Sequence, residues 1–187
     1  IWSFVVNNYL LGKSPLPFDL LYWNADTTRM PAAMHSFYLR NMYLHNRLKD
    51  PGGVIVDKIA IDLHRISAPS YLLSTREDHI APWKSTYAAT RMFQGETRFV
   101  LAASGHIAGV INPPQKRKYH YSTNEALPAT PEAWDAQSTQ RPGSWWADWA
   151  AWLAPKSGGM VPARKPGAGK SKILEAAPGS YVRAMSE

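Results

Sequence analysis

The feature that most constrains the fold of this chain is a strand–helix–strand pattern in the middle of the sequence. Residues 70–74 (SYLLS) form a short apolar run, and residues 98–103 (RFVLAA) form a second one. Between them, residues 83–93 have helical spacing, and Gly95 follows as a stop signal. Two buried strands joined by a helix within about 35 residues are typical of a parallel sheet with a right-handed crossover. The pattern therefore predicts an α/β fold.

Apolar spacing also predicts elements on either side of this unit. Helices are predicted at residues 1–11, 31–48 and 144–153, and short β-like segments at residues 54–61 and 63–66. The helix at 144–153 is rich in tryptophan (SWWADWAAWL) and is most simply packed on the body of the protein. After His106 the pattern loosens. From residue 154 onwards Pro, Gly, Lys and Ala dominate, which predicts a largely extended or mobile tail.

Composition excludes several classes of protein. The chain has 187 residues, of which 45% are hydrophobic and 19% charged, so it is not disordered as a whole. It contains no run of about 18 apolar residues, so no membrane span is expected. The net charge is +7, but the last 34 residues carry six basic and only two acidic side chains. Because most of the excess lies in this tail, we expect a solvated appendage and no nucleic-acid partner.

Cysteine is absent from the chain. This excludes disulfides, a cysteine-rich zinc site and a thiol nucleophile within these 187 residues. The histidines lack the spacing of metal ligands, so neither a metal nor another cofactor is expected. The chain opens with IWSFVVNNYLLG, without an initiator methionine, and reads like the interior of a helix. We therefore expect a fragment or a processed product.

Two ionisable side chains, Asp78 and His106, follow the two strands of the central unit. Sheets of α/β proteins place catalytic groups in such loops, and an acid followed by a histidine is the chain order of an α/β-hydrolase triad. In a triad the imidazole takes a proton from the nucleophile, and the carboxylate fixes its tautomer. Two alternatives stay open. Glu77 and His79 compete with Asp78 for its role, or Asp78 merely pairs with Arg76 while His106 caps a loop.

A nucleophile is missing from this constellation. Neither G-x-S-x-G nor its cysteine version occurs in the chain. Gly105 directly precedes His106, and Ala108 and Gly109 follow it, so the backbone can approach closely there. An acid and a histidine in the right order without a nucleophile elbow imply that the nucleophile lies upstream of this chain.

Longer stretches of the sequence carry a more specific signal. They are PLPFDLLYWNADTTRMP, FYLRNMYLHNRLK, STREDHIAPW, RFVLAASGHIAGVINPP and GSWWADWAAWL. These stretches resemble the C-terminal part of the catalytic domain of class I polyhydroxyalkanoate (poly-3-hydroxybutyrate) synthases. The resemblance runs from residue 1 to about residue 153 and resumes at LEAAPGSYVRA. The strings REDHIAPW and ASGHIAGVINPP are its most specific part.

The resemblance implies an α/β-hydrolase-like fold, of which this chain is the C-terminal half of a mostly parallel sheet with flanking helices. Residues 1–25 are then the end of a cap or insertion region. Residues 26–153 are the C-terminal part of the catalytic core, and residues 154–187 are a Pro/Gly/Lys-rich tail.

The resemblance also implies an activity, namely polymerisation of 3-hydroxyacyl-CoA, such as 3-hydroxybutyryl-CoA, into polyhydroxyalkanoate with release of CoA. Asp78 matches the acid of a Cys-His-Asp triad and His106 its histidine, while the cysteine is expected upstream. Asn46 and His79 match positions associated with the CoA moiety. Trp23 is expected near the substrate pocket or the product path.

The partners implied by the resemblance are the acyl-CoA substrate, the growing polyester chain, the granule surface, the upstream part of the same protein and a second copy in a homodimer. The expected location is the cytoplasm, on polyester granules. Without its upstream nucleophile the chain alone is expected to be inactive. Two other functions remain open, a non-catalytic module that coats granules and a polyester or thioester hydrolase of the same fold.

Overall fold

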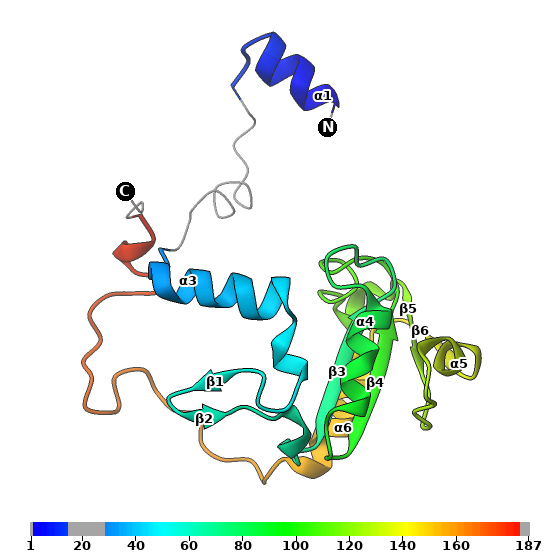
Figure 1. Ribbon diagram of the computed structural model, residues 1–187. Coiled ribbons are helices and arrows are strands. Elements are labelled where there is room, and N and C mark those ends of the chain that lie inside the picture. Colours follow the sequence, from blue (N-terminus) through cyan, green and yellow to red (C-terminus); the bar gives the residue numbers. More distant parts are fainter. Residues whose placement is uncertain (1, 15–28, 184–187) are drawn as a thin grey trace. The chain divides into compact units, whose positions relative to one another are not determined.

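The computed structural model describes residues 2–14 and 29–183 (Figure 1). The chain divides into two compact units. One unit comprises Ile1–Phe37 and Pro162–Glu187, and the other comprises Tyr38–Val161. The described residues contain no helix that is long and apolar enough to cross a membrane.

The first predicted helix is confirmed over its described residues, as α1 (Trp2–Phe4) continuing in wider turns to Leu10. The second predicted helix is also present, as α3 (Ala32–Tyr38) continuing to Leu44. It ends four residues earlier than expected. Asn46 has a φ of 47°, a left-handed conformation with which a right-handed helix cannot continue. Residues 157–179 form no helix or strand, before a short 3₁₀ turn at Ser180–Arg183.

The segment before the central unit is a hairpin followed by a turn. Strands β1 (Ile55–Val56) and β2 (Ile59–Ala60) pair antiparallel, as the β-like pattern of 54–61 predicts. The second β-like prediction, at 63–66, is wrong, because Leu63–Arg65 is a 3₁₀ turn. The carboxylate of Asp62 accepts a hydrogen bond from the backbone N–H of His64 at 2.9 Å, and this cap favours the turn over a strand.

The larger unit contains a four-stranded mixed sheet in the order β3-β4-β5-β6 (Figure 1). Its elements are β3 (Ser70–Thr75), α4 (Trp83–Tyr87) with a 3₁₀ extension to Arg91, β4 (Thr97–Ala102), β5 (His120–Thr123), α5 (Pro131–Ala136) and β6 (Thr139–Pro142). Strands β3 and β4 pair in parallel, with Thr75 opposite Ala102, so the strand–helix–strand prediction is confirmed. The other two pairings are antiparallel, and the described sheet is therefore mixed rather than mostly parallel.

The sequence pattern after His106 does not predict strands β5 and β6, because these strands are short and largely polar. β5 is HYST, and β6 is TQRP with all four residues exposed. Such an edge strand lacks the apolar alternation by which strands are found, and Pro142 is tolerated there because an edge leaves N–H positions unused.

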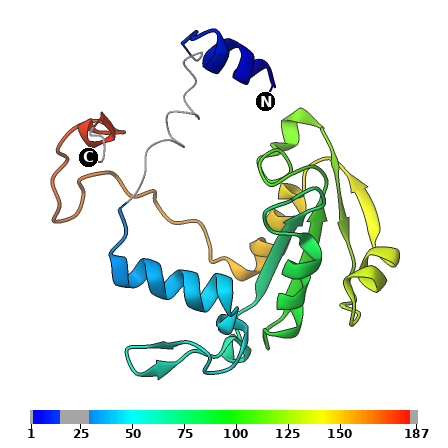
Figure 2. The same cartoon turned by 45° about the horizontal axis from the view of Figure 1, so that its top comes forward.

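Alternate residues of β4 point to opposite faces of the sheet, and each face is covered. On one face Phe99 and Leu101 pack with side chains of α4 and α5, namely Trp83, Tyr87 and Trp134. On the other face Val100 and Ala102 pack with Tyr121, and Trp145 at the start of α6 (Trp146–Leu153) lies against them. Helices therefore lie on both sides of the sheet (Figure 2), and the predicted tryptophan-rich helix is confirmed.

A charged network fastens α6 to the sheet. Asp148 of α6 accepts hydrogen bonds from Arg98 of β4, at 2.9 and 2.7 Å, and from the Tyr71 hydroxyl of β3, at 2.9 Å. Burial raises the pKa of the Asp148 carboxyl, but the hydrogen bonds from Arg98 and Tyr71 outweigh it and hold this pKa below its usual range. The carboxylate therefore stays ionised against the sheet.

Replacing Asp148 by asparagine should lower the free energy of unfolding of the full-length protein at pH 7 by about 2 kcal/mol, since Arg98 then keeps a poorly compensated charge. The measurement is urea unfolding followed by tryptophan fluorescence. Glu125→Gln is the matched control, because Glu125 contacts the same guanidinium at 3.0 Å but is 86% exposed. It should cost less than about 0.5 kcal/mol.

The difference in free energy of unfolding between wild type and Asp148→Asn should decrease as the pH falls. The folded state lowers the pKa of Asp148, so its stabilisation is present above the usual carboxyl pKa and is lost as the pH falls through the lowered value. The gap between wild type and Asp148→Asn should therefore shrink below about pH 4. If the difference in free energy of unfolding stays constant down to pH 2, the ionised Asp148 does not stabilise the fold as described.

Candidate functional site

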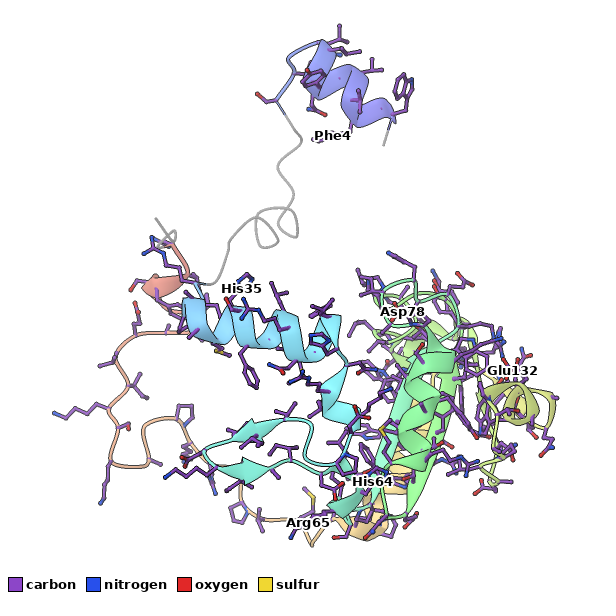
Figure 3. All side chains as sticks on the ribbon, viewed as in Figure 1. Phe4, His35, His64, Arg65, Asp78 and Glu132 are labelled. Carbon is purple, nitrogen blue, oxygen red and sulfur yellow. The ribbon has the colours of Figure 1, made fainter. Side chains whose placement is uncertain are left out.

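The topology of the sheet brings the loops after β3 and β4 to one edge. Both strands run in the same direction and end opposite each other, at Thr75 and Ala102. Asp78 lies in the first loop and His106 in the second, as expected from the sequence. In the stick view, Asp78 lies at the end of the unit opposite to His64 (Figure 3).

Backbone hydrogen bonds hold these two loops together. The N–H of Arg76 donates to the carbonyl of Ala102 at 2.8 Å, and the N–H of Glu77 donates to the carbonyl of Ser104 at 3.0 Å. Ser104 has a φ of 69°, which is rare for residues other than glycine. This conformation turns the chain sharply at the end of β4. The parallel ladder is therefore extended by two bonds past the strand ends, toward Asp78 and His106.

Asp78 is oriented by its own loop. Its Oδ1 accepts hydrogen bonds from the backbone N–H groups of Ile80, at 2.8 Å, and Ala81, at 3.0 Å. The hydrogen bond from Ala81 has the largest effect on the pKa of the Asp78 carboxyl, followed by that from Ile80. Together with the nearby His106 they hold this pKa below its usual range. The group is therefore a carboxylate at neutral pH, and its side chain is only 12% exposed.

The carboxylate of Asp78 lies against the ring of His106. The Nδ1 atom of His106 is 3.4 Å from Asp78 Oδ1, is buried, and makes no hydrogen bond within the described part of the chain. The side chain as a whole is 36% exposed, so the accessible part of the ring is not Nδ1. A carboxylate at Nδ1 favours a proton there and leaves Nε2 as the basic nitrogen, which is the arrangement a general base requires.

The neighbours of Asp78 lie differently. His79 places its ring 5.4 Å from that of His106, centroid to centroid, at an interplanar angle of 56°. The side chain of Glu77 is exposed. Arg76, which could have paired with Asp78, instead forms a two-bond ion pair with Asp135 of α5, at 3.0 and 2.6 Å. This pairing leaves the Asp78 carboxylate available to His106.

The Arg76–Asp135 pair is a feature that the sequence pattern missed. The hydrogen bond from Arg76 is the largest of the effects that lower the pKa of Asp135, and the guanidinium also lies 5.7 Å from the Trp83 ring. The sequence does carry a signal for helix α5 itself, because Thr130 caps its start and Pro131 is its first residue. The pairing itself spans 59 residues and cannot be seen in any local pattern.

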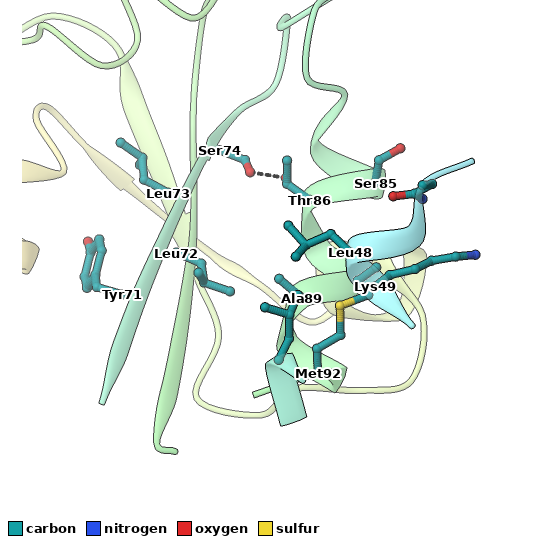
Figure 4. A pocket seen from close by; sticks show the side chains of 13 residues that line it. Leu48, Lys49, Tyr71, Leu72, Leu73, Ser74, Ser85, Thr86, Ala89 and Met92 are labelled. Carbon is teal, nitrogen blue, oxygen red and sulfur yellow. Dashed lines mark hydrogen bonds between the residues drawn. The ribbon is translucent and has the colours of Figure 1, made fainter. Parts of the chain in front are cut away.

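Asn46 lies in a different place. It lines a groove of about 760 Å³ beside β3 and α4, whose lining includes none of Asp78, His79 and His106 (Figure 4). The groove is mostly apolar, with Leu48, Leu72 and Met92 among its walls. Trp23 lies outside the described residues.

A second histidine–aspartate pair lies away from this site. His64 Nδ1 lies 3.1 Å from Asp62 Oδ1, but the two residues belong to one capped turn at the opposite end of the unit (Figure 3). No group of three His, Cys, Asp or Glu side chains within the described ranges could hold a metal ion.

The fold and this pair define a class: an α/β protein with an acid and a histidine in neighbouring strand-end loops. Comparison with known proteins is more specific. The chain is 49% identical over its whole length to the poly(3-hydroxyalkanoate) polymerase subunit PhaC of Cupriavidus necator, of which it covers 32%. It is 52% identical to the subunit of the same name from Rhizobium etli, over 97% of the chain and 28% of that protein. It is also 52% identical to the poly(3-hydroxyalkanoate) polymerase of Methylorubrum extorquens, over 98% of the chain and 30% of that protein.

The predicted resemblance is confirmed, because the chain matches part of several poly(3-hydroxyalkanoate) polymerases at about half identity over nearly its whole length. It spans about a third of the length of the curated relatives that it matches. No protein-family model matches the chain.

Proposed function

We propose that this chain supplies the acid and the histidine of a Cys-His-Asp triad in a protein that polymerises 3-hydroxyacyl-CoA into polyhydroxyalkanoate. The observation that carries the proposal is the 3.4 Å approach of His106 Nδ1 to Asp78 Oδ1, in a chain about half identical to named polymerases. The proposed fold is an α/β hydrolase, with residues 26–153 in its core. Residues 1–25 belong to the cap region, and residues 154–187 form the tail.

The first half of the reaction is acylation of a cysteine that lies upstream of this chain. His106 Nε2 takes the thiol proton, and the thiolate attacks the carbonyl carbon of the thioester. The tetrahedral intermediate collapses with cleavage of the bond to the CoA sulfur, and the proton on His106 passes to the leaving thiolate. Asp78, held as a carboxylate by the Ile80 and Ala81 N–H groups, stabilises the imidazolium that forms.

The second half of the reaction extends the ester chain. The hydroxyl of a 3-hydroxyacyl unit loses its proton to His106 and attacks the acyl group on the cysteine. The new C–O ester bond forms as the C–S bond breaks, and the cysteine recovers the proton from His106. The same base therefore serves both steps, which fits a ring with a buried Nδ1 and an accessible remainder.

Further residues are proposed to bind substrate. The His79 ring lies beside that of His106 and is suited to contact the CoA portion of the thioester. Asn46 is proposed for the same ligand, and Trp23 for the substrate pocket or the product path. The proposed assembly is a homodimer in the cytoplasm on the surface of polyester granules, with no cofactor.

The test is to supply the full-length protein that carries this chain with 3-hydroxybutyryl-CoA. CoA release is followed with a thiol reagent, and the acyl product is analysed as polymer or as free acid. We expect one CoA released for each monomer incorporated into polyester. Free 3-hydroxybutyrate as the main product overturns the proposal in favour of a hydrolase.

The 187-residue chain on its own provides a second measurement. It lacks cysteine, so it should release no CoA under the same conditions. Granule binding by this chain, combined with no CoA release by the full-length protein, identifies a non-catalytic granule-coating module and contradicts the proposed polymerase.

A further inference from the structure

We propose that Trp145 and Trp146 are positioning residues for His106, because their indole N–H groups hold the loop that carries it. The indole of Trp145 donates to the carbonyls of Gly109 and Val110, at 3.2 Å each, and that of Trp146 donates to the carbonyl of Val110 at 3.0 Å. These bonds span 35 or 36 residues and join the start of α6 to the segment directly after His106. The inference rests on the proposed function of His106.

The same segment also packs closely against the end of β4. Gly109 is buried, and a Cβ placed on it would lie 2.4 Å from the carbonyl oxygen of Ala103. The N–H of Gly109 donates to the carbonyl of Gly105 at 2.8 Å. The turn after His106 is therefore in close contact with the end of β4 and also accepts hydrogen bonds from two indoles.

The indole of Trp145 packs against the sheet. The ring of Trp145 packs on Tyr71 of β3, with 6.1 Å between ring centroids, and belongs to the apolar cluster on that face. Asp148, one turn further along α6, takes the hydrogen bonds from Arg98 and Tyr71 described above. The position of the His106 loop is thus set by a rigid sheet through α6, and not by the loop alone.

A third tryptophan, Trp149, provides a control that distinguishes a positioning role from a general loss of packing. Trp149 contacts the Trp145 ring at 6.3 Å between centroids and is 42% exposed. Its indole makes none of the bonds to the loop after His106. Exchange of tryptophan for phenylalanine keeps an aromatic ring but removes the N–H together with the five-membered ring. Trp149→Phe loses the same atoms without losing a bond to the loop, so it is the matched control for the same exchange at 145 and 146.

The test compares the double variant Trp145→Phe/Trp146→Phe with Trp149→Phe in the full-length protein. We expect kcat for CoA release to fall about tenfold in the double variant with KM changed less than about twofold, because a displaced base slows the chemistry without removing substrate contacts. Amide hydrogen exchange of a peptide covering residues 104–111 should become at least about fivefold faster. Trp149→Phe should match wild type in both measurements.

The proposal is overturned if kcat and exchange in the double variant stay at wild-type values, or if Trp149→Phe gives the same losses. If the double variant does not fold, the single variant Trp146→Phe, which removes one bond, is measured in its place against the same limits. Should the wild-type protein release no CoA, the proposed function fails, and the exchange measurement alone decides whether the indoles hold the loop.

Discussion

Replacing His106 by glutamine should abolish polymer formation in the full-length protein, with a fall in kcat/KM for CoA release on the order of 10⁴-fold. Glutamine resembles the imidazole in size but cannot accept a proton from the nucleophile, so both the acylation and the chain-extension step lose their base. The measurement is the initial rate of CoA release at saturating and at low 3-hydroxybutyryl-CoA.

The control for this substitution is His64→Gln. His64 also lies against a carboxylate, at 3.1 Å from Asp62, but within a capped turn at the opposite end of the unit. Its replacement should leave kcat/KM within about twofold of wild type, as expected of a residue away from the chemistry. Near-normal turnover in His106→Gln, or an equal loss in both variants, refutes the role of His106 as the base.

Gly109→Ala should be among the most damaging small substitutions in the chain. The added methyl would lie 2.4 Å from the Ala103 carbonyl oxygen and 2.7 Å from the Thr75 Cγ2 atom. The Ala103 oxygen belongs to the backbone directly after β4, so it cannot move away without shifting the end of that strand. We expect a loss of about 3 kcal/mol in the free energy of unfolding, in the range of severe overpacking. Urea unfolding of the full-length protein measures it.

Gly105→Ala tests whether the close approach is the cause. A Cβ on Gly105 would meet nothing nearer than the Glu77 carbonyl oxygen at 3.9 Å, which is ordinary contact. Its effect on the free energy of unfolding should stay below about 1 kcal/mol. Equal unfolding midpoints for the two variants would show that the turn after His106 yields to the extra methyl group.

Much of the central fold is predictable from the sequence because its signals are local. The two apolar runs and the helix between them predict β3, α4 and β4, and the tryptophan spacing predicts α6. Strands β5 and β6 escape prediction because four-residue polar strands are defined by their partners and not by their own composition. The cap formed by Asp62 likewise overrides the β-like pattern of the segment that follows it.

The candidate site divides in the same way. Chain order and strand ends place an acid and a histidine at one edge of the sheet, and the family resemblance selects Asp78 from its neighbours. The absence of cysteine is also a property of the sequence alone, and it directs the search for the nucleophile beyond these 187 residues. Apart from the choice of Asp78, which rests on the resemblance, these inferences need only the periodicity of the backbone and the chemistry of the residue types.

The choice of partners was decided only by the tertiary structure. Arg76 pairs with Asp135 and not with Asp78, two indoles bind the loop after His106, and Asp148 joins α6 to two strands. Each of these contacts joins residues 35 or more positions apart. The free energy of a charge or a donor depends on which groups surround it after water is removed. That environment exists only once the sheet and its helices have come together, so no local pattern can encode it.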